Sequence, residues 1–319
     1  MNEPAATQPL GPTNRNARPV ALITGASRGI GALTVAEFLR AGFDVAAVAR
    51  SGERLQALAA EAPAEGRVVP VPLDITDSSA LMAGVERVER ELGAVEVLVN
   101  NAGYGLRGAM EDVPREELEK LFLVNVFAQV EMTQAVLPHM RRRGRGRIIF
   151  VSSVQGRVVI PFSGAYGASK FALEGAADAL RRETRLFGVE VVLLEPGPVA
   201  TEFATHARSL SDEILNNTAS VYHRAYATYL EKKREINRSA VAPEKVARLI
   251  AKIARVRRPR ARYRIQRYAW LLPVLAVLLP TRLADWLLMR PYRKAYRSSG
   301  AADERATPRA EGGEGSCNE

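Results

Sequence analysis

The chain has almost no cysteine and almost no histidine, which limits the chemistry that it can perform. Its 319 residues include a single cysteine, Cys317, so no intramolecular disulfide can form, and a reducing compartment fits the composition. None of the three histidines, His139, His206 and His223, has a ligand-like neighbour at metal-binding spacing. We therefore expect no metal site.

The sequence also lacks a hydrophobic run long enough to span a membrane. Residues 1–18 are rich in Pro, Asn, Thr and Ala and have no apolar core of the kind found in a signal peptide. The most apolar stretch, 269–279, contains eleven residues and is interrupted by Pro273, whereas a spanning helix needs ~20. We expect a cytoplasmic protein, either free or peripheral on a membrane, with flexible tails at 1–18 and 298–319.

No nucleic-acid-binding motif accompanies the positive charge of the chain. Forty-five Lys and Arg against thirty-five Asp and Glu give a net charge of +10, and seven arginines fall between Arg255 and Arg267. A helix-turn-helix, zinc-finger or RNP pattern is missing. We expect no nucleic-acid partner, although a basic segment of this kind also suits an anionic surface.

Short apolar runs alternate with helical patterns over most of the chain, and 47% of the residues are hydrophobic. This alternation predicts an α/β fold with a Rossmann-type doubly wound parallel sheet of about seven strands, helices on both faces, and ligands bound at the carboxyl ends of the strands. The expected strands are 19–23, 44–49, 68–73, 95–99, 147–151, 189–194 and an edge strand at 261–265, and the expected helices include 30–41, 53–62, 118–140, 166–187 and 243–256.

The first strand leads directly into a glycine-rich turn and then a helix. Glycines 25, 29 and 31 permit a tight turn and let the backbone approach a pyrophosphate, which the helix N-terminus then stabilises. At the end of the second strand an acid would bind the ribose 2′-hydroxyl of NAD, but Arg50 stands there instead, with Arg28 as a second basic candidate. Unless both arginines are merely solvated, they favour the 2′-phosphate of NADP(H) over NAD(H).

Polar residues follow two further strands, and one lies within a helix. Asp74 either contacts an adenine edge or caps the next helix, and residues 100–103, Asn-Asn-Ala-Gly, either contact a ligand or form a simple turn. Asn125 lies in an otherwise apolar helical stretch, where it either hydrogen-bonds locally or bends the helix and holds a water near a site.

Tyr166 and Lys170 are four positions apart on an expected helix, so both side chains lie on one face. A free phenol titrates near pH ~10, and a neighbouring ammonium lowers its pKa toward the range in which a proton donor is effective. Ser153, at the end of the fifth strand, is placed to hold the reacting oxygen.

From about Pro19 to Thr201 the chain resembles the short-chain dehydrogenase/reductase family. The matching motifs, in order, are Thr24-Gly-x-x-x-Gly-x-Gly31, Asp74, Asn100-Asn-Ala-Gly103, Asn125, Ser153, Tyr166-x-x-x-Lys170, and Pro196-Gly197 with Thr201.

The resemblance implies a role for each matched residue. Tyr166 would exchange the substrate proton, Ser153 would orient the carbonyl or hydroxyl, Lys170 would lower the tyrosine pKa and bind the nicotinamide ribose, and Asn125 would anchor a relay water. The implied cofactor-binding residues are Thr24, Gly25, Ser27, Arg28, Gly29, Ile30, Gly31, Arg50, Asp74, Ile75, Asn100, Asn101, Ala102, Gly103, Tyr166, Lys170, Pro196, Gly197, Val199 and Thr201.

The C-terminal third is less regular. Residues 202–240 correspond to a substrate lid, whose aromatic residues either form an apolar wall for a substrate or pack the lid onto the sheet. The extension at 266–297 follows a catalytic domain at 19–265, and its segment 268–296 has two tryptophans among arginines. This segment either contacts a membrane surface, lines the substrate channel or packs structurally.

We therefore expect an NADP(H)-dependent oxidoreductase that interconverts a carbonyl and an alcohol on an apolar small molecule such as a steroid or retinoid. A 3-oxoacyl-thioester reductase is the alternative enzyme. An NADPH-binding sensor or scaffold docked on a membrane is the alternative of another class. The resemblance also implies a homodimer or homotetramer.

Overall fold

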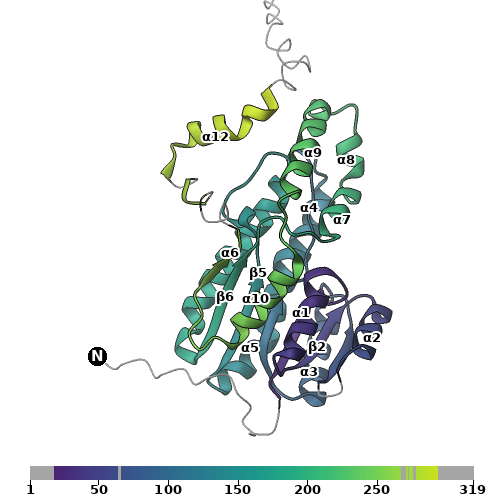
Figure 1. Ribbon diagram of the computed structural model, residues 1–319, viewed down its shortest axis with the longest axis vertical. Coiled ribbons are helices and arrows are strands. Elements are labelled where there is room, and N and C mark those ends of the chain that lie inside the picture. Colours follow the sequence, from purple (N-terminus) through teal and green to yellow (C-terminus); the bar gives the residue numbers. More distant parts are fainter. Residues whose placement is uncertain (1–17, 64–65, 267–270, 272, 276–277, 294–319) are drawn as a thin grey trace, which may run out of the picture.

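The structure is a computed structural model that describes residues 18–63, 66–266, 271, 273–275 and 278–293. The two expected flexible tails lie outside these residues, apart from Arg18, and so does part of the segment 268–296. Seven parallel strands form one sheet in the order β3-β2-β1-β4-β5-β6-β7 (Figure 1). The strands are β1 (Val20–Thr24), β2 (Asp44–Ala49), β3 (Val68–Pro72), β4 (Val95–Asn100), β5 (Gly146–Val151), β6 (Val189–Glu195) and β7 (Arg262–Arg264).

The sheet confirms the predicted fold class, and its strand order reverses between β1 and β4. A reversal of this kind opens a crevice at the carboxyl ends of the strands, where ligands bind in doubly wound folds. The central strands are buried on both faces, which explains why they read as continuous apolar runs and not as alternating ones.

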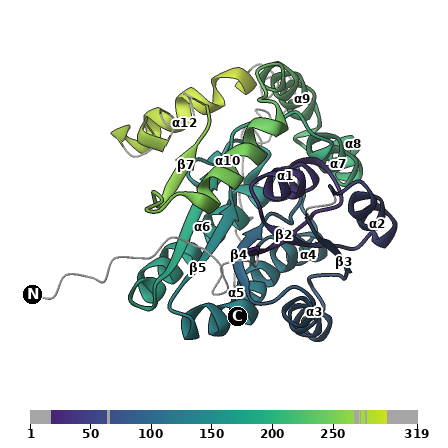
Figure 2. The same ribbon diagram turned by 60° about the horizontal axis from the view of Figure 1, so that its bottom comes forward.

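Alternate strand residues enter two hydrophobic cores, one on each face of the sheet. Ala21 and Ile23 pack beneath α1 (Gly29–Arg40), α2 (Gly52–Ala60) and α10 (Pro243–Arg255). Val20 and Leu22 pack on the opposite face against α3 (Ser78–Glu91), α5 (Ala128–Arg142) and α6 (Gly164–Thr184) (Figure 2). The two layers hold the strand ends in a fixed arrangement.

The helix predicted at 118–140 is interrupted near its centre. It consists of α4 (Arg115–Phe122), the π-helical turn η1 (Leu123–Phe127) and α5. Among the described residues, this 28-residue unit is the one helix long and apolar enough to cross a bilayer by length and composition. Half of its most apolar window is buried, and its buried residues face the sheet, as in the core helix of a globular domain.

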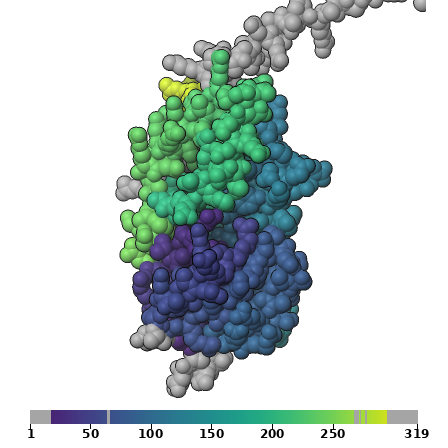
Figure 3. Space-filling model, turned by 90° about the vertical axis from the view of Figure 1, so that its right-hand side faces the viewer, coloured from purple at the N-terminus to yellow at the C-terminus, as the bar shows by residue number. Residues whose placement is uncertain are grey.

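The segment expected to form the lid contains α7 (Phe203–Ser209), α8 (Asp212–Asn216) and α9 (His223–Asn237). Figure 3 shows it in green above the N-terminal part of the molecule, which is coloured purple and blue. Tyr226 and Tyr229 are buried, and each packs edge-on against Phe162, with ring centroids 5.3 and 5.9 Å apart. These two tyrosines therefore pack the segment 202–240 against Phe162.

The C-terminal extension returns to the lid. After α12 (Thr281–Met289) a 3₁₀ turn, Arg290–Tyr292, places the buried Tyr292 against Phe162, with ring centroids 5.3 Å apart. In Figures 1 and 2, α12 lies outside the layers of the sheet and its helices. Tyr292 thus attaches the end of the extension to the aromatic cluster of the lid.

Candidate active site

The fold brings Ser153, Tyr166 and Lys170 to one place. Ser153 follows β5, and Tyr166 and Lys170 lie on the first turns of α6, where only 6% and 4% of their surfaces are exposed. The Lys170 ammonium donates a hydrogen bond to the Val151 carbonyl at 3.0 Å and lies 5.9 Å from the centre of the Tyr166 ring. The predicted grouping of these three side chains is present in the structure.

Two cations lie beside the Tyr166 ring, Lys170 and Arg107. Burial raises the pKa of Tyr166, while a hydrogen bond with Ser153 and the positive charge of Arg107 lower it. Lys170 was expected to be the group that lowers this pKa. Burial lowers the pKa of Lys170 itself to about 8, against the opposing effect of Glu174. Arg107 is a second cation beside the phenol, with its guanidinium carbon 5.4 Å from the ring centre.

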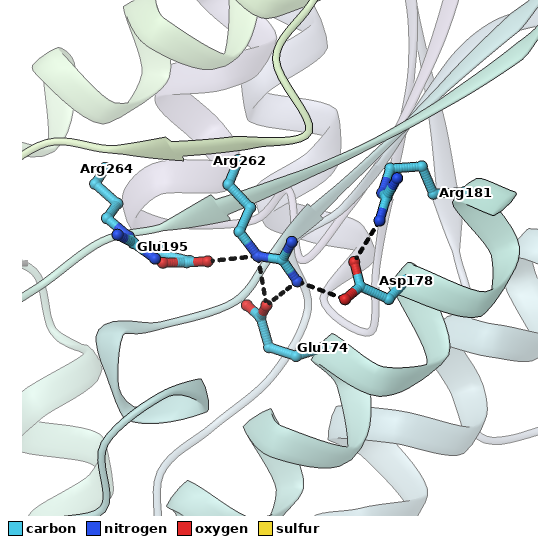
Figure 4. Close-up of polar contacts among 6 residues, drawn as sticks. All are labelled: Glu174, Asp178, Arg181, Glu195, Arg262 and Arg264. Atoms are coloured by element: carbon cyan, nitrogen blue, oxygen red, sulfur yellow. Dashed lines mark hydrogen bonds and ion pairs between the residues drawn. The ribbon is translucent and has the colours of Figure 1, made fainter. Parts of the chain in front are cut away.

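An ion-pair network fixes the back of α6 to the edge of the sheet (Figure 4). Arg262 lies 3.1 Å from Glu174, 2.9 Å from Asp178 and 3.0 Å from the fully buried Glu195, and Arg264 lies 2.5 Å from Glu195. The network holds the helix that carries Tyr166 and Lys170 against β6 and β7. Sequence analysis did not identify it, although two arginines two positions apart on a strand share one face.

Asn125 joins three parts of the chain through its amide. Its oxygen accepts a hydrogen bond from the Tyr104 amide N–H at 3.0 Å, and its nitrogen donates to the Tyr104 carbonyl at 2.9 Å and to Ser169 Oγ at 3.1 Å. The interpretation of Asn125 as a residue that bonds only within its own helix is therefore wrong. The π turn η1 aims the amide at the loop after β4 and at α6.

The glycine-rich turn has the shape needed to approach a phosphate. Gly25 and Gly29 have positive φ angles of 66° and 54°, and a Cβ on Gly31 would lie 2.1 Å from the Gly25 carbonyl oxygen. The N-terminus of α1 has no side-chain cap, so its amide N–H groups are available to an anion. These observations fit a dinucleotide pyrophosphate at this turn, beside the half-buried Ser27 and Ile30.

Two of the polar residues at the strand ends, Asn100 and Thr24, form hydrogen bonds with other parts of the protein. Asn100 is fully buried, and its side chain donates a hydrogen bond to Thr133 Oγ1 at 2.9 Å. Thr24 is also fully buried, and its Oγ1 accepts hydrogen bonds from the amides of Asn101 and Ala102, both at 3.0 Å. These contacts hold the glycine-rich turn against the loop after β4.

The same loop is closed by Asn101 and Gly103. Asn101 donates to the carbonyls of Thr24 at 3.0 Å and Gly25 at 3.3 Å. A Cβ on Gly103 would lie 2.9 Å from Asn125 Oδ1, so this position requires glycine.

Asp74 does not cap the helix that follows it. Its carboxylate accepts hydrogen bonds from the Thr76 amide at 3.0 Å and the Thr76 hydroxyl at 2.8 Å. Asp77 caps α3 by accepting from the Ala80 amide at 2.9 Å, so the capping interpretation of Asp74 is wrong. Asp74 is exposed at the strand end and Ile75 beside it is buried, which leaves Asp74 accessible to a ligand.

Two arginines gather near the end of β2. Burial and the positive charges of Arg28 and Arg50 lower the pKa of His206. Arg28 is 3.6 Å from Glu202, whereas no carboxylate pairs with Arg50 in the part of the chain that the structure describes. Arg50 therefore offers an exposed, uncompensated cation beside the glycine-rich turn.

The loop after β6 is supported from the last strand. Gln266 accepts a hydrogen bond from the Gly197 amide at 2.9 Å and donates to the Pro198 carbonyl at 2.9 Å. Val199 forms an isolated parallel bridge with Val241. The predicted loop from Pro196 to Thr201 is thus held at the strand ends by Gln266, a residue that sequence analysis did not identify.

Comparison with known proteins links this geometry to one family. A family model described as short chain dehydrogenase matches residues 19–211. The chain is 38% identical over 255 residues to 17-beta-hydroxysteroid dehydrogenase type 1 of Homo sapiens, covering 77% of each chain. It is 32% identical over 285 residues to the NADPH-dependent 3-dehydrocapnine reductase of Ornithobacterium rhinotracheale, covering 88% of this chain and 99% of that one.

Solved structures show the same architecture. A short-chain dehydrogenase from Streptomyces avermitilis superposes with a TM-score of 0.69 at 28% identity, covering 91% of this chain and 97% of its own. A metagenomic short-chain oxidoreductase in complex with NADP superposes with a TM-score of 0.62 at 29% identity, covering 78% and 97%.

Proposed function

The chain belongs to the short-chain dehydrogenase/reductase family, and we propose that this enzyme uses NADP(H) to interconvert a carbonyl and an alcohol on a largely apolar small molecule. The observation that carries the proposal is the meeting of Ser153, Tyr166 and Lys170 at the carboxyl end of β5, beside a glycine-rich turn shaped for a dinucleotide. A protein that only binds NADPH needs the turn and has no need of the three side chains, which argues against the sensor or scaffold alternative.

When bound, the nicotinamide supplies or accepts the hydride. In reduction the Tyr166 hydroxyl donates a proton to the developing alkoxide, and in oxidation the Tyr166 phenolate accepts the proton of the alcohol. Ser153 orients the same substrate oxygen by a hydrogen bond. Lys170, held by the Val151 carbonyl at 3.0 Å, lies beside the phenol and would bind the nicotinamide ribose. Asn125 holds the loop after β4 through Tyr104 and contacts α6 through Ser169, and it would anchor the relay water that the family resemblance implies.

A preference for NADP(H) over NAD(H) rests on the basic residues beside the turn. Arg50 has the position at the end of β2 from which an acid would bind a ribose hydroxyl, and a guanidinium there suits a 2′-phosphate. The positive charge of Arg28 lowers the pKa of His206, as does that of Arg50. The NADPH dependence of the Ornithobacterium relative and the NADP complex of the metagenomic enzyme support this preference.

The substrate site lies under the lid formed by residues 202–240. The ring of Phe203 is 5.9 Å from the Tyr166 ring and 37% exposed, so it offers an apolar surface next to the reacting oxygen. The human relative is named for a hydroxysteroid, which supports a bulky apolar carbonyl compound. A 3-oxoacyl thioester remains the alternative substrate.

The proposal is tested by following NADPH oxidation with purified protein over ketosteroids, retinal, an acyl-carrier-protein thioester and simple aldehydes, and by repeating each assay with NADH. We expect turnover of an apolar ketone or aldehyde with NADPH and slower turnover with NADH. Reduction of the thioester alone would favour the alternative enzyme. No turnover of any carbonyl, with NADPH still bound, would favour the sensor or scaffold.

We further propose that α12 touches an anionic membrane surface. Its Leu283, Trp286 and Leu287 are each more than 40% exposed, and the guanidinium carbons of Arg290 and Arg293 lie 5.8 and 5.3 Å from the Trp286 ring centre. Tryptophan beside arginine suits the interface of an anionic bilayer. The catalytic domain at 19–265 would then face the bilayer through its extension at 266–297.

Flotation with phosphatidylserine vesicles tests this membrane contact. We expect the wild type to float and a Trp286→Ser/Leu287→Ser variant to remain in the dense fraction. Leu186→Ser is the matched control, because Leu186 is 91% exposed on the turn after α6. Equal flotation of all three proteins would mean that α12 serves the structure only.

A homodimer or homotetramer, usual in this family, would cover a second apolar surface. Leu123, Phe127 and Phe171 are 41%, 59% and 44% exposed on the adjoining elements η1 and α6. We propose that a second copy of this chain packs here. Light scattering after size-exclusion chromatography should give at least a dimer for the wild type and a monomer for Phe127→Glu/Phe171→Glu, and an unchanged mass would contradict the assignment.

A further inference from the structure

Arg107 is a buried cation without a carboxylate. Only 6% of its surface is exposed, and its one side-chain hydrogen bond, from Nη1, goes to Ser163 Oγ at 2.7 Å. No acidic side chain pairs with it within the described ranges of the chain. A guanidinium has five N–H donors, and burying its charge without an anion is costly.

The uncompensated charge faces the reacting group. The guanidinium carbon of Arg107 lies 5.4 Å from the centre of the Tyr166 ring. A Cβ on Gly105 would lie 3.3 Å from both Arg107 Nη2 and Phe203 Cε1, so the free end of the guanidinium adjoins the apolar surface that covers Tyr166. A ligand at Tyr166 would therefore meet Phe203 and Arg107 together.

The surrounding chain fixes Arg107 in this place. Its amide donates to Ser211 Oγ at 2.8 Å, and the Ser163 hydroxyl that it contacts is also 3.2 Å from the Tyr229 hydroxyl. Phe162, immediately before Ser163, has a φ angle of 61°, a left-handed conformation that is strained for a bulky residue. Such a constraint is expected where a side chain must be held in one position.

A second cation lies on α9, the helix that carries Tyr229. Lys233 follows Tyr229 by one helical turn on α9, so both lie on one face of the helix. Burial, and then the positive charge of Arg107, lower the pKa of Lys233 to about 7. Neither group has an acid to neutralise it among the residues described, and each makes the other less favourable in the absence of an anion.

We propose that Arg107 and Lys233 form an anion-binding subsite next to Tyr166, so that the enzyme's preferred substrate is an apolar carbonyl compound with a negatively charged group, such as a carboxylate or a sulfonate. The inference rests on the proposed carbonyl chemistry for its placement, since the subsite adjoins the tyrosine that would exchange the proton. The charged group would bind to the Arg107 guanidinium while the apolar part packs against Phe203.

A different use of Arg107 would be to stabilise the Tyr166 phenolate and to bind no substrate group. That role would affect charged and neutral ligands equally and would shift the pH profile of turnover. The subsite, in contrast, discriminates between ligands that differ only in charge. Ligand binding without turnover therefore separates the two roles.

The test uses the full-length, NADPH-saturated protein and three eight-carbon probes of the same chain length, octanoate, octane-1-sulfonate and 1-octanol. Isothermal titration calorimetry gives the dissociation constant of each probe. We expect the two anions to bind at least tenfold more tightly than the alcohol. Arg107→Met should weaken anion binding roughly tenfold to a hundredfold, as expected for loss of a hydrogen bond to a charged group, and should leave octanol binding unchanged.

Further variants keep the test decisive if Arg107→Met does not fold. Lys233→Met should weaken anion binding by a smaller factor, and Arg107→Lys should retain part of it. Octanoate and octane-1-sulfonate distinguish a carboxylate site from a sulfonate site. Equal binding of anions and octanol, no saturable binding of either anion, or an equal loss of all probes in Arg107→Met would overturn the inference. Anion binding that depends on Arg107 without turnover of any carbonyl would retain the subsite and reject the proposed oxidoreductase activity.

Discussion

Two arginines lie beside helix α6, the buried Arg107 and the partly buried Arg262, and their surroundings are opposite. Arg262 lies within 3.1 Å of three carboxylates, those of Glu174, Asp178 and Glu195. Arg107 contacts one hydroxyl and the face of Tyr166. A buried charge is stable only when it is paired. The charge of Arg262 is neutralised by carboxylates of the protein, whereas the charge of Arg107 has no such partner among the described residues, and a ligand can supply one.

The difference separates a structural region from a binding region of the same helix. The compensated cluster, Arg262 with its three carboxylates, holds α6 to β6 and β7 (Figure 4). It thereby keeps Tyr166 and Lys170 in position at the strand ends. Arg107, with Ser163 and Tyr166, lies beside Phe203 of the segment 202–240, where we propose that the substrate binds. A site that must receive an anion cannot contain its own, so some stability is given up there for binding.

The largest expected effect concerns the compensated cluster. Arg262→Met leaves Glu174 and the fully buried Glu195 without their shared cation, and it should lower the free energy of unfolding by about 3–5 kcal/mol. Arg107→Met removes a buried charge that has no acid, so its unfolding free energy should stay the same or rise. Urea denaturation of both variants measures the difference, and a loss in Arg107→Met as large as that in Arg262→Met would remove the distinction.

The pH dependence of stability sharpens the comparison at Lys233. Its pKa is lowered from 10.5 to about 7 in the folded protein, so between these values the unfolded chain binds more protons and the free energy of unfolding rises with pH. The destabilisation is fully present below pH ~7, and after allowance for the partial exposure of Lys233 it amounts to about 2 kcal/mol.

Lys233→Met should therefore be more stable than the wild type at pH ~6.5 and should show a flatter rise toward pH ~10. Lys232→Met is the matched control, because Lys232 lies on the same helix and pairs with Glu235 at 2.8 Å at the surface. Urea midpoints at the two pH values measure the effect. A Lys233→Met curve parallel to that of the wild type would show that Lys233 is not buried in its charged state.

The smallest expected effect concerns Arg50, which is exposed. Like Arg107 and Lys233, it pairs with no carboxylate among the described residues. Arg50→Ser should raise the KM for NADPH about tenfold and leave the KM for NADH nearly unchanged, because only NADPH has the 2′-phosphate. Arg54→Ser, at an exposed position on α2, is the matched control. An equal rise for both cofactors would assign Arg50 to the general stability of the site.

The architecture was predictable because buried parallel strands are short apolar runs that end in turn residues. Asp44–Ala49 was predicted with its observed bounds, and the other strands were predicted to within one residue at each end. The glycine-rich turn was equally clear, since Gly31 has no room for a side chain. Local patterns sufficed where local sterics decide the conformation.

The buried charges were not predictable because their partners are distant in sequence. Glu174 and Arg262 are 88 positions apart, and Arg107 is buried through contacts with Ser163 and Ser211 that no spacing indicates. The π turn at Asn125 was also missed, since its cause is the bond to Tyr104 across the chain. Tertiary contacts of this kind leave no periodic pattern in the sequence.

The central claim is that Tyr166 exchanges the substrate proton during hydride transfer with NADPH. The most direct test compares NADPH oxidation by the wild type and by Tyr166→Phe, with the carbonyl substrate found in the screen, after NADPH binding by both has been verified by fluorescence. We predict a loss of turnover of about 10²–10⁴-fold with unchanged cofactor affinity. Turnover by Tyr166→Phe at the wild-type rate would contradict the claim.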